Sequence, residues 1–250
     1  MGNIMDNSGG GNGAANETGG QPAETYETLA KLVDHLLLRA DLSEDEVAEG
    51  CRVAREYNVC SVVVRPSDVD QVVRWMNGSS VRVASTVGYP DGSSNTGAKL
   101  YEGRDLLRRG VKEIDMTINI GKMISRQFQY VEMELLQMGK SCQESGALLK
   151  VDLASKYLTQ DLKIIATKIC KRIESSFLCV DYDLRDLALV FPLLKDRVQL
   201  KTSSGIESLA EALEVREAGC TRFGTTATAS ILDDWKTHLD QQASGAAAEG

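Results

Sequence analysis

The chain has 250 residues, 42% of them hydrophobic and 26% charged, which is enough material for one large domain or two small ones and excludes a short peptide module. Its formal charge is −8, with Lys and Arg spread along the chain, so nucleic acid and anionic membranes are not expected partners. No apolar run approaches the roughly 20 residues of a membrane span, and the first residues lack a signal-peptide pattern, so a soluble cytoplasmic protein is expected.

The two ends of the chain differ in composition from its middle. Residues 1–22 are rich in Gly and Asn, residues 241–250 are rich in Ala, and both have few large apolar side chains. Such segments cannot bury enough surface to offset the entropy of ordering. We therefore predict a disordered leader over 1–22, a globular domain over 23–240 and a flexible tail over 241–250.

Within this domain, short apolar β-branched runs alternate with longer amphipathic segments. A first unit, LAKLVDHLLL, is followed by a predicted capping box at Ser43 and Glu46. The run 59–64 precedes a helical pattern through Trp75, and the run 81–88 precedes a helix over about 95–109. The later runs are EIDMTINI, ALLKVDLA, SFLCVDY, RVQLKTS and CTRFGTT. Continuous apolar strands separated by helices are typical of a parallel sheet that is buried on both faces.

Eight such units, closed by the helical segment TASILDDWKTHL, predict an α/β protein with a single (β/α)8 TIM barrel. A doubly wound open sheet is the alternative. That fold usually has a Gly-rich phosphate turn after its first strand, whereas LRADLSEDE follows the first strand here.

Three charged residues lie inside apolar strands, where a barrel would direct them towards its active end: Asp115, Lys150 and Lys201. Each alone is also compatible with a surface position or a structural ion pair. A charge inside the barrel is costly to desolvate unless it is paired, so strands four, five and seven are predicted to bring these groups into contact. Together they favour a site.

The loops after the last two strands, 202–205 and 224–226, stand where barrels commonly bind phosphate through backbone N–H groups. Ordinary turns are the alternative.

His35 could act as an acid or base, but a lone His is more typical of the core. His238 is expected at the surface. The six cysteines show no CxxC or Cys/His pairing, so neither disulfides nor a metal site is predicted. Burial should raise the pKa of Cys60 and Cys179.

Seven segments between Leu32 and Leu232 resemble, in order and spacing, the 2-deoxyribose-5-phosphate aldolase family. They are DHLLLRADLSEDEV, CSVVVRPSDV, VASTVGYPDGSSNTGAKLYE, VKEIDMTINIG, LLKV, LKTSSGI and GCTRFGTT. The resemblance implies a class I aldolase barrel without metal or other cofactor. The reaction it implies is cleavage of 2-deoxy-D-ribose 5-phosphate to acetaldehyde and glyceraldehyde 3-phosphate through a lysine Schiff base.

The resemblance also assigns roles to individual residues. Asp115 matches the acid of the proton relay, and Lys201 matches the strand-seven lysine beside the reactive one. The reactive lysine of strand six is missing: the matching segment, SFLCVDYD, puts Cys179 in its position, or Val180 if the register slips by one. The implied substrate-binding residues are Lys150, Ser204, Gly205, Gly224 and Thr225.

Further departures surround the missing lysine. Ala154 replaces a usual Glu, Ser204 replaces the first of two glycines, and Asp181, Tyr182 and Asp183 replace a hydroxyl-bearing loop. Two carboxylates in that loop should repel a phosphate dianion. The sequence thus predicts a family protein with weak or absent activity on a small phosphorylated sugar or aldehyde.

Two alternatives stay open. One is a noncatalytic barrel that binds a metabolite or serves in assembly, and the other uses Cys179 as a thiol nucleophile towards aldehydes. Both a homodimer and a hetero-oligomer are compatible with the sequence.

Overall fold

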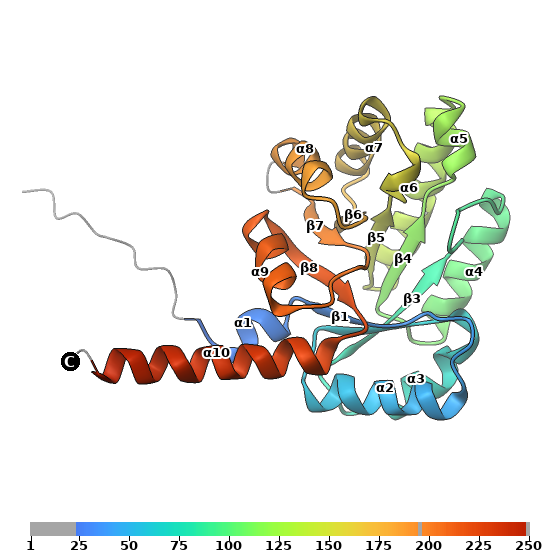
Figure 1. Ribbon diagram of the computed structural model, residues 1–250. Coiled ribbons are helices and arrows are strands. Elements are labelled where there is room, and N and C mark those ends of the chain that lie inside the picture. The colour runs from blue at the N-terminus through green and yellow to red at the C-terminus, as the bar shows by residue number, and fades with distance from the viewer. Residues whose placement is uncertain (1–23, 195–196, 249–250) are drawn as a thin grey trace, which may run out of the picture.

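The computed structural model describes residues 24–194 and 197–248, and in these residues eight parallel strands close into a barrel in sequence order (Figure 1). The strands are β1 (Val33–Leu37), β2 (Ser61–Val64), β3 (Arg82–Val87), β4 (Glu113–Thr117), β5 (Leu148–Asp152), β6 (Phe177–Val180), β7 (Gln199–Thr202) and β8 (Cys220–Thr225). The predicted (β/α)8 barrel is therefore confirmed, and the open sheet is excluded because β1 pairs with β8.

Helices connect the strands and cover the outside of the barrel. The α-helices are α1 (Tyr26–Ala30), α2 (Glu44–Glu56), α3 (Val69–Trp75), α4 (Thr96–Arg108), α5 (Ile120–Ile124), α6 (Phe128–Glu144), α7 (Gln160–Arg172), α8 (Leu184–Leu194), α9 (Leu209–Glu217) and α10 (Thr228–Ala248). Short 3-10 helices, η1 (Pro66–Asp68) and η2 (Ser155–Tyr157), follow β2 and β5. The capping box predicted at the start of α2 is present: the Ser43 side chain accepts from the Glu46 N–H, and the Glu46 carboxylate accepts from the Ser43 N–H.

The ends of the described chain lie on one side of the barrel, where α1 packs against α10. Figure 1 shows α10 continuing past the barrel, and its residues 241–245 are exposed. Residues 241–248, which the sequence assigns to a tail, belong to this helix, so the predicted boundary at residue 240 is not a helix end. The predicted leader lies outside the described residues.

Strand alternation divides the side chains between two environments. Leu178 and Val180 of β6 face outwards and pack into the apolar layer between strands and helices. Their neighbours Phe177 and Cys179 face the interior, where Arg222 lies over the Phe177 ring and Cys179 lines a cavity. The register therefore places Cys179, and not Val180, inside the barrel.

Candidate functional site

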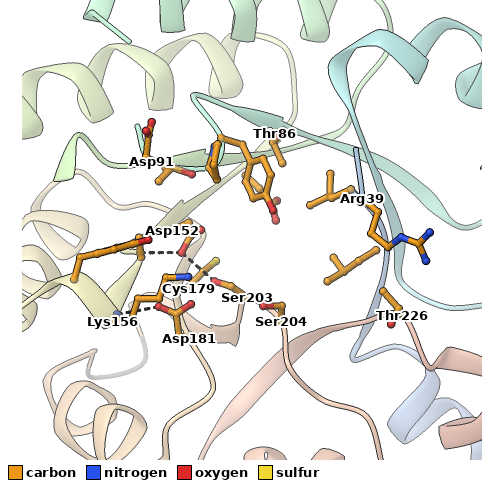
Figure 2. Close-up of a pocket in the computed structure, with 18 residues that line it drawn as sticks. Arg39, Thr86, Asp91, Asp152, Lys156, Cys179, Asp181, Ser203, Ser204 and Thr226 are labelled. Atoms are coloured by element: carbon orange, nitrogen blue, oxygen red, sulfur yellow. Dashed lines mark hydrogen bonds between the residues drawn. The ribbon is translucent and has the colours of Figure 1, made fainter. Parts of the chain in front are cut away.

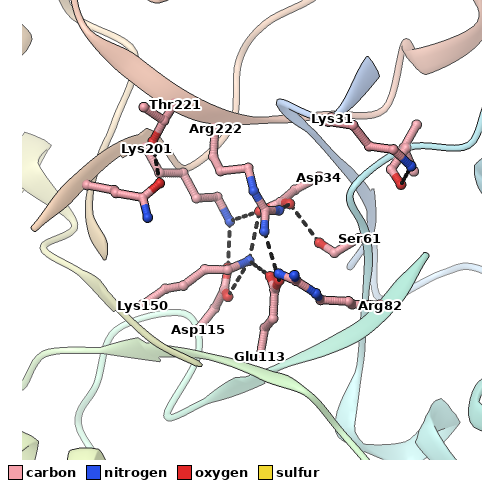
Figure 3. A network of polar contacts seen from close by, with 12 residues as sticks. Lys31, Asp34, Ser61, Arg82, Glu113, Asp115, Lys150, Lys201, Thr221 and Arg222 are labelled. Carbon is pink, nitrogen blue, oxygen red and sulfur yellow. Dashed lines mark hydrogen bonds and ion pairs between the residues drawn. The ribbon is translucent and has the colours of Figure 1, made fainter. Parts of the chain in front are cut away.

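The centre of the barrel holds charged side chains in place of the branched apolar residues that usually fill a TIM barrel. Three carboxylates face three cations there, and we call this set the lumen ionic cluster (Figure 3); its members are Asp34, Glu113, Asp115, Lys150, Lys201 and Arg222. The formal charges of the six side chains cancel. Each charge has an opposite charge beside it, which is the condition under which burial of ions is tolerated.

Lys150 occupies the middle of the cluster and is completely buried. Its Nζ atom lies 2.6 Å from Glu113, 2.8 Å from Asp34 and 3.2 Å from Asp115. Burial alone would lower the pKa of Lys150, but the carboxylates outweigh it, led by Asp115 and Asp34, and the pKa is raised. Because Lys150 is enclosed by protein carboxylates and does not line the cavity, its role in substrate binding stays a prediction.

Lys201 lies closer to the open end of the barrel but is still only 1% exposed. Its Nζ atom contacts Asp115 at 2.6 Å and Asp34 at 2.8 Å. Burial opposes protonation, yet the carboxylates of Asp115 and Asp34 prevail and hold the pKa of Lys201 well above that of an ordinary lysine. The contacts predicted between Asp115, Lys150 and Lys201 are thus present, and Lys201 is held as an ammonium ion.

Half of this cluster, Asp34, Glu113 and Arg222, was not predicted from the sequence. Asp34 accepts hydrogen bonds from Ser61 and Lys150 and also pairs with Arg222, while Glu113 lies 2.8 Å from Arg222. The signal that identified Asp115 was also present for these residues, because each is a charge within an apolar strand. Burial raises the pKa of Asp34, but Lys150 and the other cations outweigh it and hold that pKa well below its ordinary value.

Above the cluster, the C-terminal ends of the strands surround a cavity of about 300 Å³, which we call the mouth cavity (Figure 2). Its floor carries Asp115, Asp152 and Cys179, and Tyr89 and Tyr157 lie at its rim with about half of each side chain exposed. It has the size of a small-molecule site and the position at which TIM barrels place their active groups.

Cys179 stands where the resemblance places the reactive lysine. It is paired in register with Asp152 of β5 on one side and Lys201 of β7 on the other, and it is 1% exposed. Burial, the largest influence, raises the pKa of the Cys179 thiol well above its ordinary value. Burial likewise raises the pKa of Cys60. Both predicted directions are confirmed, and neither thiol is activated as a thiolate.

Asp152 is a site residue that sequence reasoning missed. One of its carboxylate oxygens, Oδ1, accepts hydrogen bonds from the Ala154 N–H at 3.1 Å and from the Ser203 hydroxyl at 3.0 Å. Burial, with a smaller contribution from the neighbouring carboxylate of Asp181, raises the pKa of Asp152 to about 6. The signal was its position two residues after Lys150, which puts both side chains on the inner face of one strand.

The two loops predicted to bind phosphate meet at the mouth cavity. Ser204 and Thr226 line it, and Gly205 is exposed with φ +92°. A Cβ on Gly224 would lie 2.2 Å from the Ser203 carbonyl oxygen, so Gly at this position allows the two loops to approach each other. Thr225 is buried, and its hydroxyl donates to the Ile206 carbonyl. Ligand binding by Ser204, Gly205, Gly224 and Thr225 stays a prediction.

The two loop acids expected to repel phosphate lie in different environments. Asp181 lines the mouth cavity, whereas Asp183 pairs with the exposed Arg185 at 2.8 Å outside it. Of the two loop acids, only Asp181 is therefore placed to repel a phosphate in the cavity. Asp152 of β5 adds a second carboxylate there.

Neither histidine belongs to the mouth cavity. His35 Nδ1 lies 2.8 Å from the Thr228 hydroxyl, and burial lowers the pKa of His35 to about 4, so the ring is neutral at pH 7. His238 stacks on Trp235 in α10 with ring centroids 5.3 Å apart.

Among the described residues, no group of His, Cys, Asp and Glu side chains has the arrangement of a metal site. In the same residues, no helix is long and apolar enough to span a membrane.

The closed barrel, with lysines and carboxylates beneath a cavity at the C-terminal ends of its strands, has the architecture of a TIM-barrel enzyme. No protein-family model matches the chain. The deoxyribose-phosphate aldolase of Caldanaerobacter subterraneus subsp. tengcongensis is 30% identical over 221 residues, which cover 85% of this chain and 96% of that relative. The chain belongs to the deoxyribose-phosphate aldolase family.

Solved structures agree with this assignment. The structure of QR15, an aldolase, has a TM-score of 0.79 and 27% identity, and the match covers 84% of this chain and 97% of that one. The tetrameric deoxyribose phosphate aldolase from Aeropyrum pernix has a TM-score of 0.79 over 85% of this chain and 92% of that one. At 23% identity, the second likeness concerns the fold alone.

Proposed function

We propose that this protein is a deoxyribose-phosphate aldolase family member with weak or no Schiff-base activity on 2-deoxy-D-ribose 5-phosphate. Such chemistry needs an unprotonated primary amine that reaches the carbonyl carbon of the substrate. The observation that carries the proposal is the combination of Cys179 at the inward position of β6 with Lys201 clamped between Asp34 and Asp115.

The ion pairs of Lys201 with Asp34 and Asp115 make its amine a poorer nucleophile. A lysine with an ordinary pKa of 10.4 is about 0.04% neutral at pH 7. The carboxylates raise the pKa of Lys201 further, so its neutral fraction is smaller still. The Lys150 ammonium, which shares Asp34 and Asp115 with Lys201, favours loss of the proton, but the carboxylates prevail. On β6, a thiol and not a further ammonium stands beside Lys201.

Residual activity through Lys201 would require two changes. The ammonium would have to release its contact with Asp34, 2.8 Å away, and transfer a proton to Asp115, 2.6 Å away. The first change would separate opposite charges inside a buried cluster, and the second would remove the positive charge that Lys201 presents to Asp34. Since losing a covalent nucleophile commonly lowers kcat by several orders of magnitude, turnover by this route would be slow.

The test is cleavage of 2-deoxy-D-ribose 5-phosphate by the purified full chain, with the Caldanaerobacter aldolase measured in parallel. We expect kcat/KM at least about 1,000-fold below that of the relative. Lys201→Met is the matched control, because activity that persists in this variant comes from a contaminating aldolase. A value for the unmodified chain within tenfold of the relative would overturn the proposal.

A further inference from the structure

Two carboxylates at the mouth cavity, those of Asp152 and Asp181, accept hydrogen bonds from donors of the neighbouring loops. Asp152 accepts from the Ala154 N–H and the Ser203 hydroxyl. Asp181 accepts from the Lys156 N–H at 3.0 Å and from the Ser155 hydroxyl at 3.3 Å. These are the kinds of donor, backbone N–H groups and loop hydroxyls, with which proteins hold a phosphate.

In the described residues, neither of the two cations that line the mouth cavity forms an ion pair with Asp152 or Asp181. Arg39 forms two hydrogen bonds with Asp41, and Figure 2 shows its guanidinium directed away from Asp152 and Ser203. The Lys156 ammonium lies 5.2 Å from the centre of the Tyr157 ring at the rim. Asp152 and Asp181 therefore line the cavity as carboxylates without an ion-pair partner in the described residues.

One oxygen of Asp152 remains available as a hydrogen-bond acceptor at the floor. Asp152 uses Oδ1 for both of its hydrogen bonds, and in the described residues its second oxygen, Oδ2, has no hydrogen-bond donor although the carboxyl lines the cavity. Such an oxygen can accept from a ligand hydroxyl but repels a phosphate oxygen. Beside Asp152, the arrangement fits a ligand group that donates hydrogen bonds and is not anionic.

We propose that Asp152 is a specificity-determining residue that excludes phosphate groups from the mouth cavity and favours an unphosphorylated, hydroxyl-bearing aldehyde sugar. The inference rests on the mouth cavity being the ligand site of this family protein. It concerns binding and does not require a Schiff base, so it can fail or hold independently of the proposed lack of aldol cleavage.

The surroundings of Asp152 favour this role at neutral pH. It faces the carboxylate of Asp181, the carboxylate of Asp115 and the thiol of Cys179, and burial raises its pKa to about 6. At pH 7.5 the Asp152 carboxyl is therefore ionised. Its negative charge has no direct ion pair in the described residues, unlike Asp115, which contacts two lysines.

The test is an NMR titration of the isotope-labelled full chain at pH 7.5 with 2-deoxyribose and with 2-deoxyribose 5-phosphate. Asp152→Asn removes the charge while keeping the shape. Asp183→Asn is the matched control, since it removes the same charge from a loop residue that pairs with Arg185 outside the cavity. Asp152→Ser, also checked by circular dichroism, serves if the first variant does not fold.

We expect the unmodified protein to bind 2-deoxyribose at least tenfold more tightly than its 5-phosphate. Asp152→Asn should reduce this preference at least tenfold, and Asp183→Asn should leave it unchanged. Equal or tighter binding of the phosphorylated sugar by the unmodified protein would overturn the proposal. So would absence of binding by both sugars, or an equal effect of the two Asn substitutions.

Discussion

Replacing Cys179 with lysine would place a primary amine on the inner face of β6. The Cys179 side chain faces the mouth cavity, so a longer side chain has about 300 Å³ of space above it. The new amine would stand beside Lys201, its register partner on β7. We expect Cys179→Lys to gain Schiff-base activity.

The size of the effect follows from Coulomb's law. Neighbouring strands lie about 5 Å apart, and two like charges at that distance repel by about 3 kcal/mol at an effective dielectric constant near 20. This energy corresponds to about two pKa units. Asp34 and Asp115 keep Lys201 protonated, so the introduced amine takes the downward shift. Its neutral fraction at pH 7 then rises from about 0.04% to several per cent.

Cleavage of 2-deoxy-D-ribose 5-phosphate provides the assay, and borohydride reduction in the presence of acetaldehyde locates the reacting amine by peptide mass mapping. We expect about a 100-fold gain in kcat over the unmodified chain, in proportion to the neutral amine, and an ethyl adduct at position 179. Cys179→Met is the control, because it adds length without an amine. A folded Cys179→Lys variant that forms no adduct would refute the electrostatic reasoning.

Three further predictions concern stability, each measured by urea unfolding. Lys150→Met leaves carboxylates without their shared cation and should lower the free energy of unfolding by about 3–5 kcal/mol; a loss under 1 kcal/mol would contradict the stated role of the cluster. Since the folded-state pKa of Asp152 is raised, its contribution is fully present below about pH 4 and is lost as pH rises through about 6. Asp152→Asn should thus stabilise the protein by about 1–3 kcal/mol at pH 8 and have little effect at pH 4; equal effects at both pH values would argue against the raised pKa. Ser43→Ala removes the N-cap of α2 and should cost about 1 kcal/mol, whereas no change would show that the cap is dispensable.

The fold was predictable because its signals are local. The apolar run SVVV became β2, buried at every position, and the capping box at Ser43 began α2 where the sequence placed it. Parallel pairing of neighbouring strands then follows from the order of the units. The helical residues 241–248 were not predicted, because their Ala-rich composition was interpreted only as a lack of core side chains, although Ala also favours helix.

The site was predictable in part. A charge within an apolar strand identified Asp115 and Lys201, and they meet because both project into the lumen. Asp34 and Arg222 show the same pattern but were not predicted as site residues. Their ion pair contributes to the charge balance around the lysines. The inward position of Asp152 follows from its spacing to Lys150, but its raised pKa could not be predicted from sequence, since it depends on enclosure by residues from other strands.

The most direct test of the central claim is reductive trapping on the unmodified protein. The full chain is incubated with acetaldehyde and borohydride at pH 7, and the modified lysines are identified by mass spectrometry, with Lys201→Met treated in parallel. Because Lys201 is held as an ammonium by Asp34 and Asp115, we predict no ethyl adduct at Lys201 beyond the level on exposed lysines. Near-stoichiometric modification of Lys201 would show that its amine is available, and would contradict the account.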